Sequence, residues 1–230
     1  MNDLAGIAQA VSVWFLPVII AITFHEAAHG WVADRLGDDT ARRLGRVSFN
    51  PLRHVDPFGT LVLPAILVLL HAPFLFGWAK PVPVAFHRLD NPKRDMIWVA
   101  LAGPAINIAL ALAAGLLLQV VGELNANTVT LWLWENLKNA ILANVVLACF
   151  NMLPIPPLDG GRVLTGLLPR PLAWRFAGLE RYGLLVILGL AFVVPLLGRP
   201  LGYELNPLGS VLLPMVQVVH GAVLRLTGWA

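Results

Sequence analysis

Apolar residues run through this chain in long uncharged stretches, without the short alternating patterns of a water-soluble domain. The uncharged stretches occupy residues 4–24, 57–79, 96–122, 139–158, 182–198 and 205–224. A helix of about 20 apolar residues, within a range of about 17 to 25, crosses the hydrocarbon core of a bilayer. The pattern predicts an α-helical integral membrane protein with about five transmembrane helices. They are expected from residue 4 to near Leu36, and over 96–121, 137–153, 183–197 and 207–224.

The stretch 57–79 differs from the others. It is interrupted by Gly59, Pro64, Pro73 and Gly77. Basic segments flank both of its ends, and crossing the membrane here would place residues 80–94 outside, against the rule that basic loops face the cytoplasm. We interpret it as a re-entrant segment, a form that is tolerated where irregular backbone is buried in protein or lines a cavity. A plain spanning helix followed by an unusually basic outer loop is the alternative.

Composition supports a single membrane domain. The chain has 230 residues, of which 58% are hydrophobic and 13% charged, whereas soluble domains carry about 25% charged residues. We expect one polytopic domain over residues 1–230, with its core motifs within 18–170 and additional transmembrane helices within 183–225. The first apolar stretch is not expected to be a cleaved signal peptide, because its amino end carries Asp3 and no basic residue.

The basic residues of the chain are concentrated in a few segments that we expect to lie on one side of the membrane. A net charge of +3 could suggest a nucleic-acid partner, but the Lys and Arg residues gather in segments 35–53, 80–94 and 162–181, with Arg225 near the end. This pattern is typical of cytoplasmic loops. We therefore expect a multi-pass protein of the cell membrane in contact with lipid, and no nucleic-acid partner. With Cys149 as the single cysteine, a cysteine-rich metal site is excluded.

The sequence HEAAH at residues 25–29 carries the first candidate chemistry. His25 and His29 are four residues apart, so one face of a helix presents both imidazoles. Ionisable groups at the end of a membrane helix are costly and usually functional. The HExxH arrangement provides two zinc ligands, and Glu26 is placed to act as the general base.

A catalytic zinc usually takes three protein ligands and leaves a fourth position for water. Asp159, in the stretch FNMLPIPPLDGGR at 150–162, follows an uncharged run at the end of a predicted helix. Two crossings between His29 and Asp159 return the chain to the same side of the membrane, near the cytoplasm. Asp159 is therefore the candidate third ligand, and an ordinary helix-terminal turn residue is the alternative.

Three motifs together resemble those of one protein family. HEAAH, GPAIN at 103–107 and NMLPIPPLDGG at 151–161 are similar to motifs of the site-2 protease family, the intramembrane zinc metalloproteases of peptidase family M50. They occur in the family's order, and the chain looks like the compact bacterial form without a PDZ or CBS domain.

The resemblance implies a reaction and a site. It implies Zn²⁺ held by His25, His29 and Asp159, with Glu26 as catalytic base and Asn151 as a catalytic residue beside the bound substrate. The implied reaction is hydrolysis within or near transmembrane segments of membrane-protein substrates, as in regulated intramembrane proteolysis. The implied location is the bacterial inner membrane, with an adaptor or a prior site-1-type protease as a possible partner. The sequence does not indicate an oligomeric state.

Two further elements are candidates for substrate contact. Asn107 could line the site, although an amide that bonds one helix to another fits equally well. The stretch GWAKPVPVAF at 77–86 reads as an extended or β element, and Lys80, Pro81 and Val82 could hold an unwound substrate by strand addition. A plain interfacial loop is the alternative.

Two other functions would use the same ligands. A membrane metal-ion transporter or sensor needs polar groups along a pathway, and the outer halves of helices 96–121 and 183–197 offer almost none. A membrane zincin could instead act on small soluble peptides.

Overall fold

The computed structural model describes residues 2–62, 65–66, 69, 79–198, 200 and 205–229. Within these residues the secondary structure is helical and no strand is found. The predicted α-helical membrane fold is confirmed, whereas the predicted β element finds no counterpart in the described residues 79–86.

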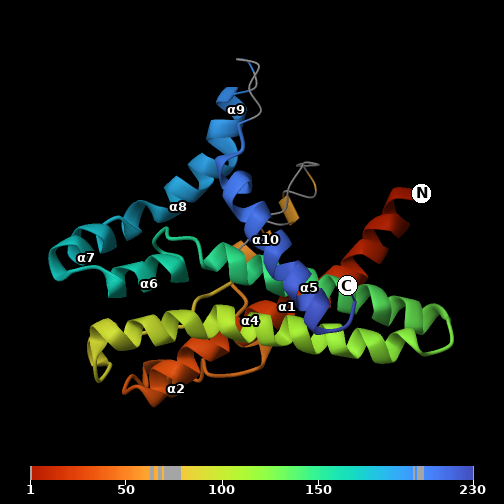
Figure 1. Cartoon of the computed structure of the whole chain (residues 1–230), viewed down its shortest axis with the longest axis horizontal. Helices are drawn as coiled ribbons and strands as arrows, with labels where there is room; N and C mark the ends of the chain where they lie inside the picture. The colour runs from red at the N-terminus through yellow and green to blue at the C-terminus, as the bar shows by residue number, and fades with distance from the viewer. Residues whose placement is uncertain are drawn as a thin grey trace.

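Three long helices form the centre of the molecule. These are α1 (Asn2–Arg35), α4 (Pro92–Gly122) and α5 (Thr128–Asn151). Each packs against the other two, and α4 and α5 share the longest contact. Figure 1 shows α4 and α5 side by side, joined by a short connection, with α1 crossing them.

The start of α5 is set by a local capping signal. The Asn127 side chain accepts hydrogen bonds from the backbone N–H groups of Val129 and Thr130, and the Thr130 hydroxyl accepts one from the Asn127 N–H. This reciprocal pair satisfies donors at the helix end that would otherwise lack partners. The helix therefore begins at Thr128, nine residues before the start at 137 that the uncharged pattern predicted.

The remaining described elements lie around this centre. They are α2 (Thr40–Arg43), η1 (Pro51–Arg53), η2 (Pro57–Val62), η3 (Phe86–Arg88), α6 (Asp159–Leu167), α7 (Arg170–Ala177), α8 (Glu180–Leu188), η4 (Gly189–Val193), α9 (Val194–Gly198) and α10 (Pro207–Leu226). The segment from α8 through η4 to α9 leads away from the centre, and α10 packs back against α4 and α5 (Figure 1).

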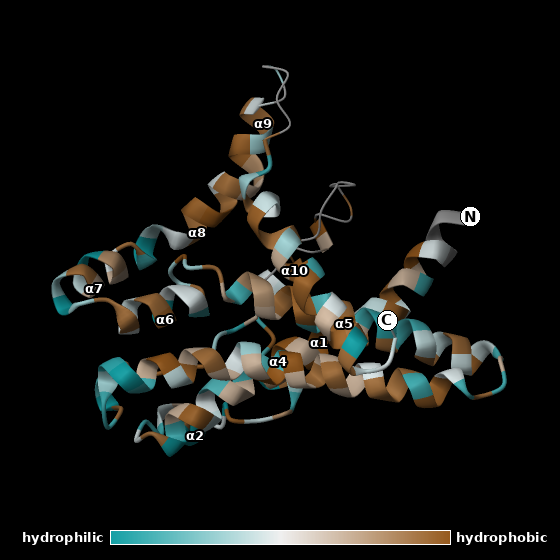
Figure 2. Ribbon diagram, viewed as in Figure 1, coloured by the Kyte–Doolittle hydropathy of each residue, from teal (hydrophilic) through white to brown (hydrophobic). Residues whose placement is uncertain are grey.

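Four helices of the described part are long and apolar enough to cross a membrane: Gly6–Arg35, Pro92–Gly122, Glu180–Gly198 and Pro207–Leu226. Apolar residues dominate them in Figure 2, while hydrophilic residues gather around α2 and the neighbouring start of α4. The fifth predicted membrane helix, α5, is not among the four. It contains four asparagines, together with Glu135 and Lys138, and these polar groups lower its mean hydropathy.

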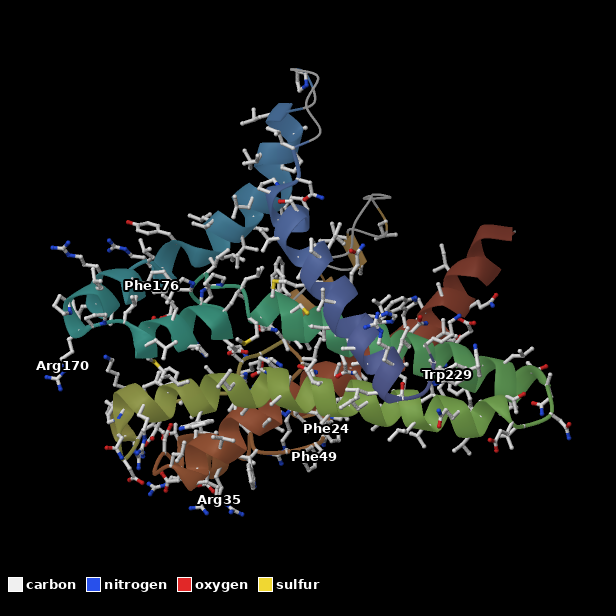
Figure 3. The ribbon with its side chains drawn as sticks, viewed as in Figure 1. Phe24, Arg35, Phe49, Arg170, Phe176 and Trp229 are labelled. Carbon is white, nitrogen blue, oxygen red and sulfur yellow. The ribbon has the colours of Figure 1, made fainter. Side chains whose placement is uncertain are left out.

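A cluster of buried apolar residues packs α4, α5 and α10 together. Ala111, Ala114 and Leu118 of α4 pack with Ile141, Val145 and Cys149 of α5 and with Val223 of α10. Lipid tails are as apolar as these side chains, so helix association in a membrane depends on close packing and interhelical hydrogen bonds. One such bond joins the Trp229 indole N–H to the Gly115 carbonyl over 2.9 Å, and Trp229 is labelled beside α4 in Figure 3.

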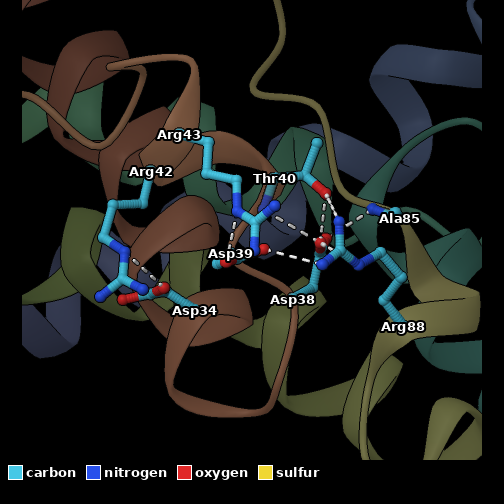
Figure 4. Close-up of polar contacts among 8 residues, drawn as sticks. All are labelled: Asp34, Asp38, Asp39, Thr40, Arg42, Arg43, Ala85 and Arg88. Atoms are coloured by element: carbon cyan, nitrogen blue, oxygen red, sulfur yellow. Dashed lines mark hydrogen bonds and ion pairs between the residues drawn. The ribbon is translucent and has the colours of Figure 1, made fainter.

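A polar clamp ties the end of α1 to the segment before α4. The buried Asp38 carboxylate accepts hydrogen bonds from Thr40 and from the backbone N–H of Ala85, and Arg88 lies within ion-pair distance of Asp38 and Asp39 (Figure 4). Burial raises the pKa of Asp38, but these hydrogen bonds and Arg88 outweigh it and lower the pKa below its ordinary value. The carboxylate is therefore ionised and holds residues 85–88 against α1.

The predicted re-entrant stretch 57–79 lies mostly outside the described residues. Its beginning, Pro57–Val62, forms a wide helical turn in which the Asp56 side chain accepts hydrogen bonds from the N–H groups of Phe58 and Gly59. The choice between a re-entrant and a spanning segment therefore stays a prediction.

Candidate metal centre

One helix, α1, and the start of another, α6, bring three ligand atoms together. Nε2 of His25 lies 3.0 Å from Nε2 of His29, and Oδ2 of Asp159 lies 3.2 Å and 3.3 Å from these two nitrogens. All three side chains are buried, with exposed fractions of 4–6%. The structure thus joins the residues that the sequence predicted as ligands into one group that could hold a metal ion.

The hydrogen bonds behind the imidazoles decide which nitrogens face this group. His25 Nδ1 lies 2.6 Å from Oδ1 of Asn107, and His29 Nδ1 lies 2.7 Å from the carbonyl oxygen of Val99. Oxygens of this kind only accept, so each Nδ1 carries a proton and donates it. In a neutral imidazole the other nitrogen then presents a lone pair. Both Nε2 atoms are therefore available as ligands.

Three electron-rich atoms at this separation repel one another unless positive charge lies among them. Oδ2 of Asp159 is buried and has no hydrogen-bond partner of acceptable geometry in the described part of the chain. Zinc with bonds of about 2.0–2.2 Å in a tetrahedral site holds its ligand atoms about 3.3 Å apart. The observed distances of 3.0–3.3 Å match this spacing. The donor set and its geometry fit a zinc ion with one position left open.

The charge state of the acidic ligand also fits. Burial raises the pKa of the Asp159 carboxyl, but the two neighbouring imidazoles, that of His29 foremost, outweigh this and hold the pKa well below its usual range. The carboxylate is ionised at neutral pH and supplies the negative charge that the ion requires.

Gly103 of the GPAIN motif makes room for the imidazoles. A Cβ atom at this position would lie 2.5 Å from His25 Cε1 and 2.5 Å from His29 Nε2. Real Cβ atoms do not approach so closely, so any larger residue would displace both ligands. The motif residue that could have been simple helix packing is a spatial requirement of the centre.

Asp159 is placed by the chain that follows α5. Helix α5 ends at Asn151, the prolines at 154, 156 and 157 prevent its continuation, and Asp159 is the first residue of α6. Gly160 and Gly161 pack directly on the backbone of the preceding turn, where a Cβ would collide with Met152 and Pro156. The predicted break after α5 is confirmed, and it turns the carboxylate toward α1.

Glu26 is linked to the non-helical segment of residues 80–85 that precedes η3 and α4. Its Oε2 accepts a hydrogen bond of 2.6 Å from the backbone N–H of Val82. Gly30 allows this approach, because a Cβ there would lie 3.0 Å from side-chain carbons of Val47 and Val82. The predicted base is therefore hydrogen-bonded to the segment of residues 80–85.

Residues 80–85 are held in place by hydrogen bonds to their backbone groups. The Lys80 N–H donates to the His54 carbonyl, and Arg46 Nη2 donates to the carbonyls of Lys80 and Pro81 over 2.5 Å and 3.2 Å. Pro81 and Pro83 have no N–H to donate. A stacked pair, Phe24 and Phe49, holds the preceding loop against α1 (Figure 3).

The two other predicted site residues lie in different surroundings. Asn107 is fully buried, and its amide bonds to His25, to the Ala21 carbonyl and to Asn144. This placement supports a role in holding His25 and leaves no exposed atom for a substrate. Asn151 is half-buried at the end of α5, where its Nδ2 donates to the Leu147 carbonyl. Its role beside a substrate stays a prediction.

The sequence analysis did not single out Asn144 or the carbonyl of Val99. Asn144 carried a usable signal, because it is an amide inside an apolar helix, two turns before Asn151. The carbonyl of Val99 carried none, since any residue provides one.

Comparison with known proteins identifies the family. The model of peptidase family M50 matches residues 119–192. Three similar proteins carry the name "Putative zinc metalloprotease". They are YwhC of Bacillus subtilis, 36% identical over 92% of this chain and 89% of YwhC, and Rip2 of Mycobacterium tuberculosis and of Mycolicibacterium smegmatis, 30% and 28% identical over 78% and 79% of this chain and 66% of each Rip2. No solved structure matches the chain.

These similarities agree with the geometry of the centre. The alignment with YwhC covers nearly the whole chain and therefore spans both the histidine helix and the Asp159 turn. The predicted family, the class of metallopeptidase and the zinc cofactor are confirmed, and they favour an enzyme over a transporter. The chain belongs to peptidase family M50.

Proposed function

We propose that this protein is an intramembrane zinc metalloprotease that hydrolyses peptide bonds within or beside the transmembrane segments of other membrane proteins. The observation that carries the proposal is the convergence of three lone-pair atoms, from His25, His29 and Asp159, inside a group of membrane helices. A zinc ion there would polarise the scissile carbonyl and acidify a water molecule. The three side chains would hold the ion in place, and Asp159 would offset part of its positive charge.

Glu26 would act as the general base. Its carboxylate follows His25 directly on α1, so it lies beside the ligand face of the same helix. It would take a proton from the attacking water while the oxygen bonds to the scissile carbon. When the carbon–nitrogen bond breaks, Glu26 would return the proton to the leaving amine.

Residues 80–85 are our candidate for substrate binding. A helical substrate must unwind locally, because its carbonyls are otherwise engaged in hydrogen bonds. The non-helical backbone of Lys80, Pro81 and Val82 lies beside Glu26, and in this proposal it pairs with the unwound strand of the substrate. Pairing of the substrate with the Val82 N–H would replace the hydrogen bond that this group now donates to Glu26.

The proposed cellular setting rests on the charge pattern of the chain. The end of α1 and the start of α6 carry the ligands, and the arginine-bearing α2 follows α1 directly in the chain. The positive-inside rule then favours a multi-pass protein of the cell membrane with its active site near the cytoplasm. Regulated proteolysis, with an adaptor or a preceding site-1-type protease, is consistent with such a site and completes the proposal.

The proposal is tested with purified protein reconstituted into liposomes with a single-span substrate. We expect Glu26→Gln to bind zinc as the native protein does and to leave the substrate uncut. A soluble peptide with the same scissile sequence serves as the comparison. Cleavage by Glu26→Gln at the native rate would refute the catalytic assignment, and cleavage of the soluble peptide alone would replace the membrane substrate by a small-peptide one.

A further inference from the structure

A chain of amides connects α5 to the metal centre through α4. Asn144 of α5 accepts, at its Oδ1, a hydrogen bond of 2.8 Å from Nδ2 of Asn107, and Oδ1 of Asn107 lies 2.6 Å from His25 Nδ1. Both asparagines are buried, with exposed fractions of 2% for Asn144 and 0% for Asn107. Three helices thus share one line of polar groups.

Backbone carbonyls fix the direction of this chain. Nδ2 of Asn144 donates to the Ala140 carbonyl over 2.9 Å, and Nδ2 of Asn107 donates to the Ala21 carbonyl over 3.1 Å. A carbonyl cannot donate, so neither amide can be reversed without facing oxygen to oxygen. Asn144 therefore presents its oxygen to Asn107, which in turn presents its oxygen to His25.

The orientation of these two amides determines which nitrogen of His25 carries the proton. An acceptor at Nδ1 keeps the proton of His25 on that nitrogen and leaves Nε2 free toward His29 and Asp159. With Asn144 present, both hydrogens of the Asn107 amide have partners, which fixes the plane of the amide. Without Asn144, one hydrogen would be left unpaired in a buried site, and the amide could turn to find another partner.

We infer that Asn144 is a positioning residue for the metal centre, acting through Asn107 on the orientation and tautomer of His25. It contacts neither the metal ligands nor the space beside Glu26 in any hydrogen bond of the described residues. Because α5 leads directly to Asp159, the same contact fixes the register of the helix that precedes the third ligand against the helix that carries the first. The inference rests on the proposed zinc site, and it does not require that the substrate is a membrane protein.

The test measures zinc affinity by competition with a chromophoric chelator, on full-length protein in detergent. We expect Asn144→Leu to bind zinc about 10-fold more weakly than the native protein, and Asn107→Leu up to about 100-fold more weakly, as for other residues that orient ligands. The double variant should bind no more weakly than Asn107→Leu alone, since Asn144 acts through Asn107.

Two variants separate positioning from general packing. Asn139→Leu is the matched control. Asn139 likewise bonds α5 to a neighbouring helix, in this case α1 through a bond of 3.1 Å to the Val13 carbonyl, but has no link to His25. Asn144→Asp is the rescue, since a neutral aspartic acid offers one oxygen to Asn107 and an O–H to Ala140. Both should bind zinc within about threefold of the native protein.

Several outcomes would overturn the inference. These are native affinity in Asn144→Leu, equal weakening by Asn139→Leu, or a double variant that is weaker than Asn107→Leu by the full effect of Asn144→Leu. If Asn144→Leu does not fold, Asn144→Ala takes its place in the same comparison. Protein that shows the expected affinities but cuts no substrate would instead refute the proposed proteolysis and leave this inference standing.

Discussion

The carboxylate of Glu26 accepts a hydrogen bond of 2.6 Å from the backbone N–H of Val82, 56 positions later in the chain. The proposed base is thus hydrogen-bonded to the segment, residues 80–85, that is proposed to hold the substrate. Movement of residues 80–85 changes the hydrogen bonding of Glu26, and a substrate that pairs with this segment competes for the same N–H.

Arg46 should matter for cleavage without contacting the centre. Its guanidinium holds the carbonyls of Lys80 and Pro81. We expect Arg46→Met to loosen this segment and lower the cleavage rate about 10-fold, while zinc content stays at the native level. Rate and metal content are measured on the same reconstituted samples.

Arg53→Met is the matched control for that experiment. Arg53 also bonds a carbonyl of the same loop, that of Gly45, but does not reach residues 80–85. Equal losses in both variants would show that the loop as a whole, and not the grip of Arg46, is responsible.

A methyl group at position 103 should disrupt the centre. In Gly103→Ala the new Cβ would lie 2.5 Å from atoms of His25 and His29, so both imidazoles must move. We expect zinc affinity to fall at least about 10-fold, measured by chelator competition. Gly221→Ala in α10, where nothing lies within 4 Å of the added Cβ, should keep native affinity. Native affinity in Gly103→Ala would contradict the geometry of the site.

Removing the acidic ligand should remove the metal. Asp159→Ala leaves two imidazoles and takes away the negative charge beside them. We expect zinc per protein, measured by atomic absorption after dialysis, to fall well below one. A chelator should abolish cleavage by the native protein, and added zinc should restore it. Unchanged metal content in Asp159→Ala would exclude this residue as a ligand.

The polar clamp should make stability depend on pH. The pKa of Asp38 is lowered from 3.8 in the folded protein, so the stability that it contributes is complete above about pH 5 and is lost as the pH falls through and below 3.8. We expect Asp38→Asn to unfold more easily at pH 7 by about 2 kcal/mol, because it weakens hydrogen bonds to a charged group.

The prediction is checked by measuring the free energy of unfolding of the native protein and of Asp38→Asn in detergent from pH 7 to pH 3. The difference between the two proteins should shrink as the pH falls. A difference that grows toward low pH would mean that the folded state does not favour the ionised carboxyl of Asp38.

The parts of the site that the sequence predicted are those with local or motif-level signals. The pair His25 and His29 follows from helical spacing alone, and Asp159 follows from a carboxylate at a helix end on the matching side of the membrane. The hydrogen bonds that hold the ligands in place could not be predicted in this way. Asn107 and Asn144 are 37 positions apart, and their contact depends on how α4 and α5 pack.

The predicted helix boundaries likewise agree with the structure for some helices and not for others. Absence of charge located α1, α4 and α10, but it placed the start of α5 too late, because Glu135 and Lys138 interrupt the apolar run while the capping residues at 127–130 begin the helix earlier. Residues 79–86 were predicted to be extended, and the described backbone there contains no strand. Its prolines remove the donors that regular pairing would need.

The polarity of α5 has a consequence for biogenesis. A helix with four buried or half-buried asparagines and two charges inserts poorly by itself, whereas α4 enters a bilayer readily. We expect the two to leave the translocon as a paired hairpin, with the amides of α5 sheltered by α4 and α1 from the outset. Correct integration of the nascent chain and formation of the Asn107–Asn144 bond that supports His25 would then be a single event.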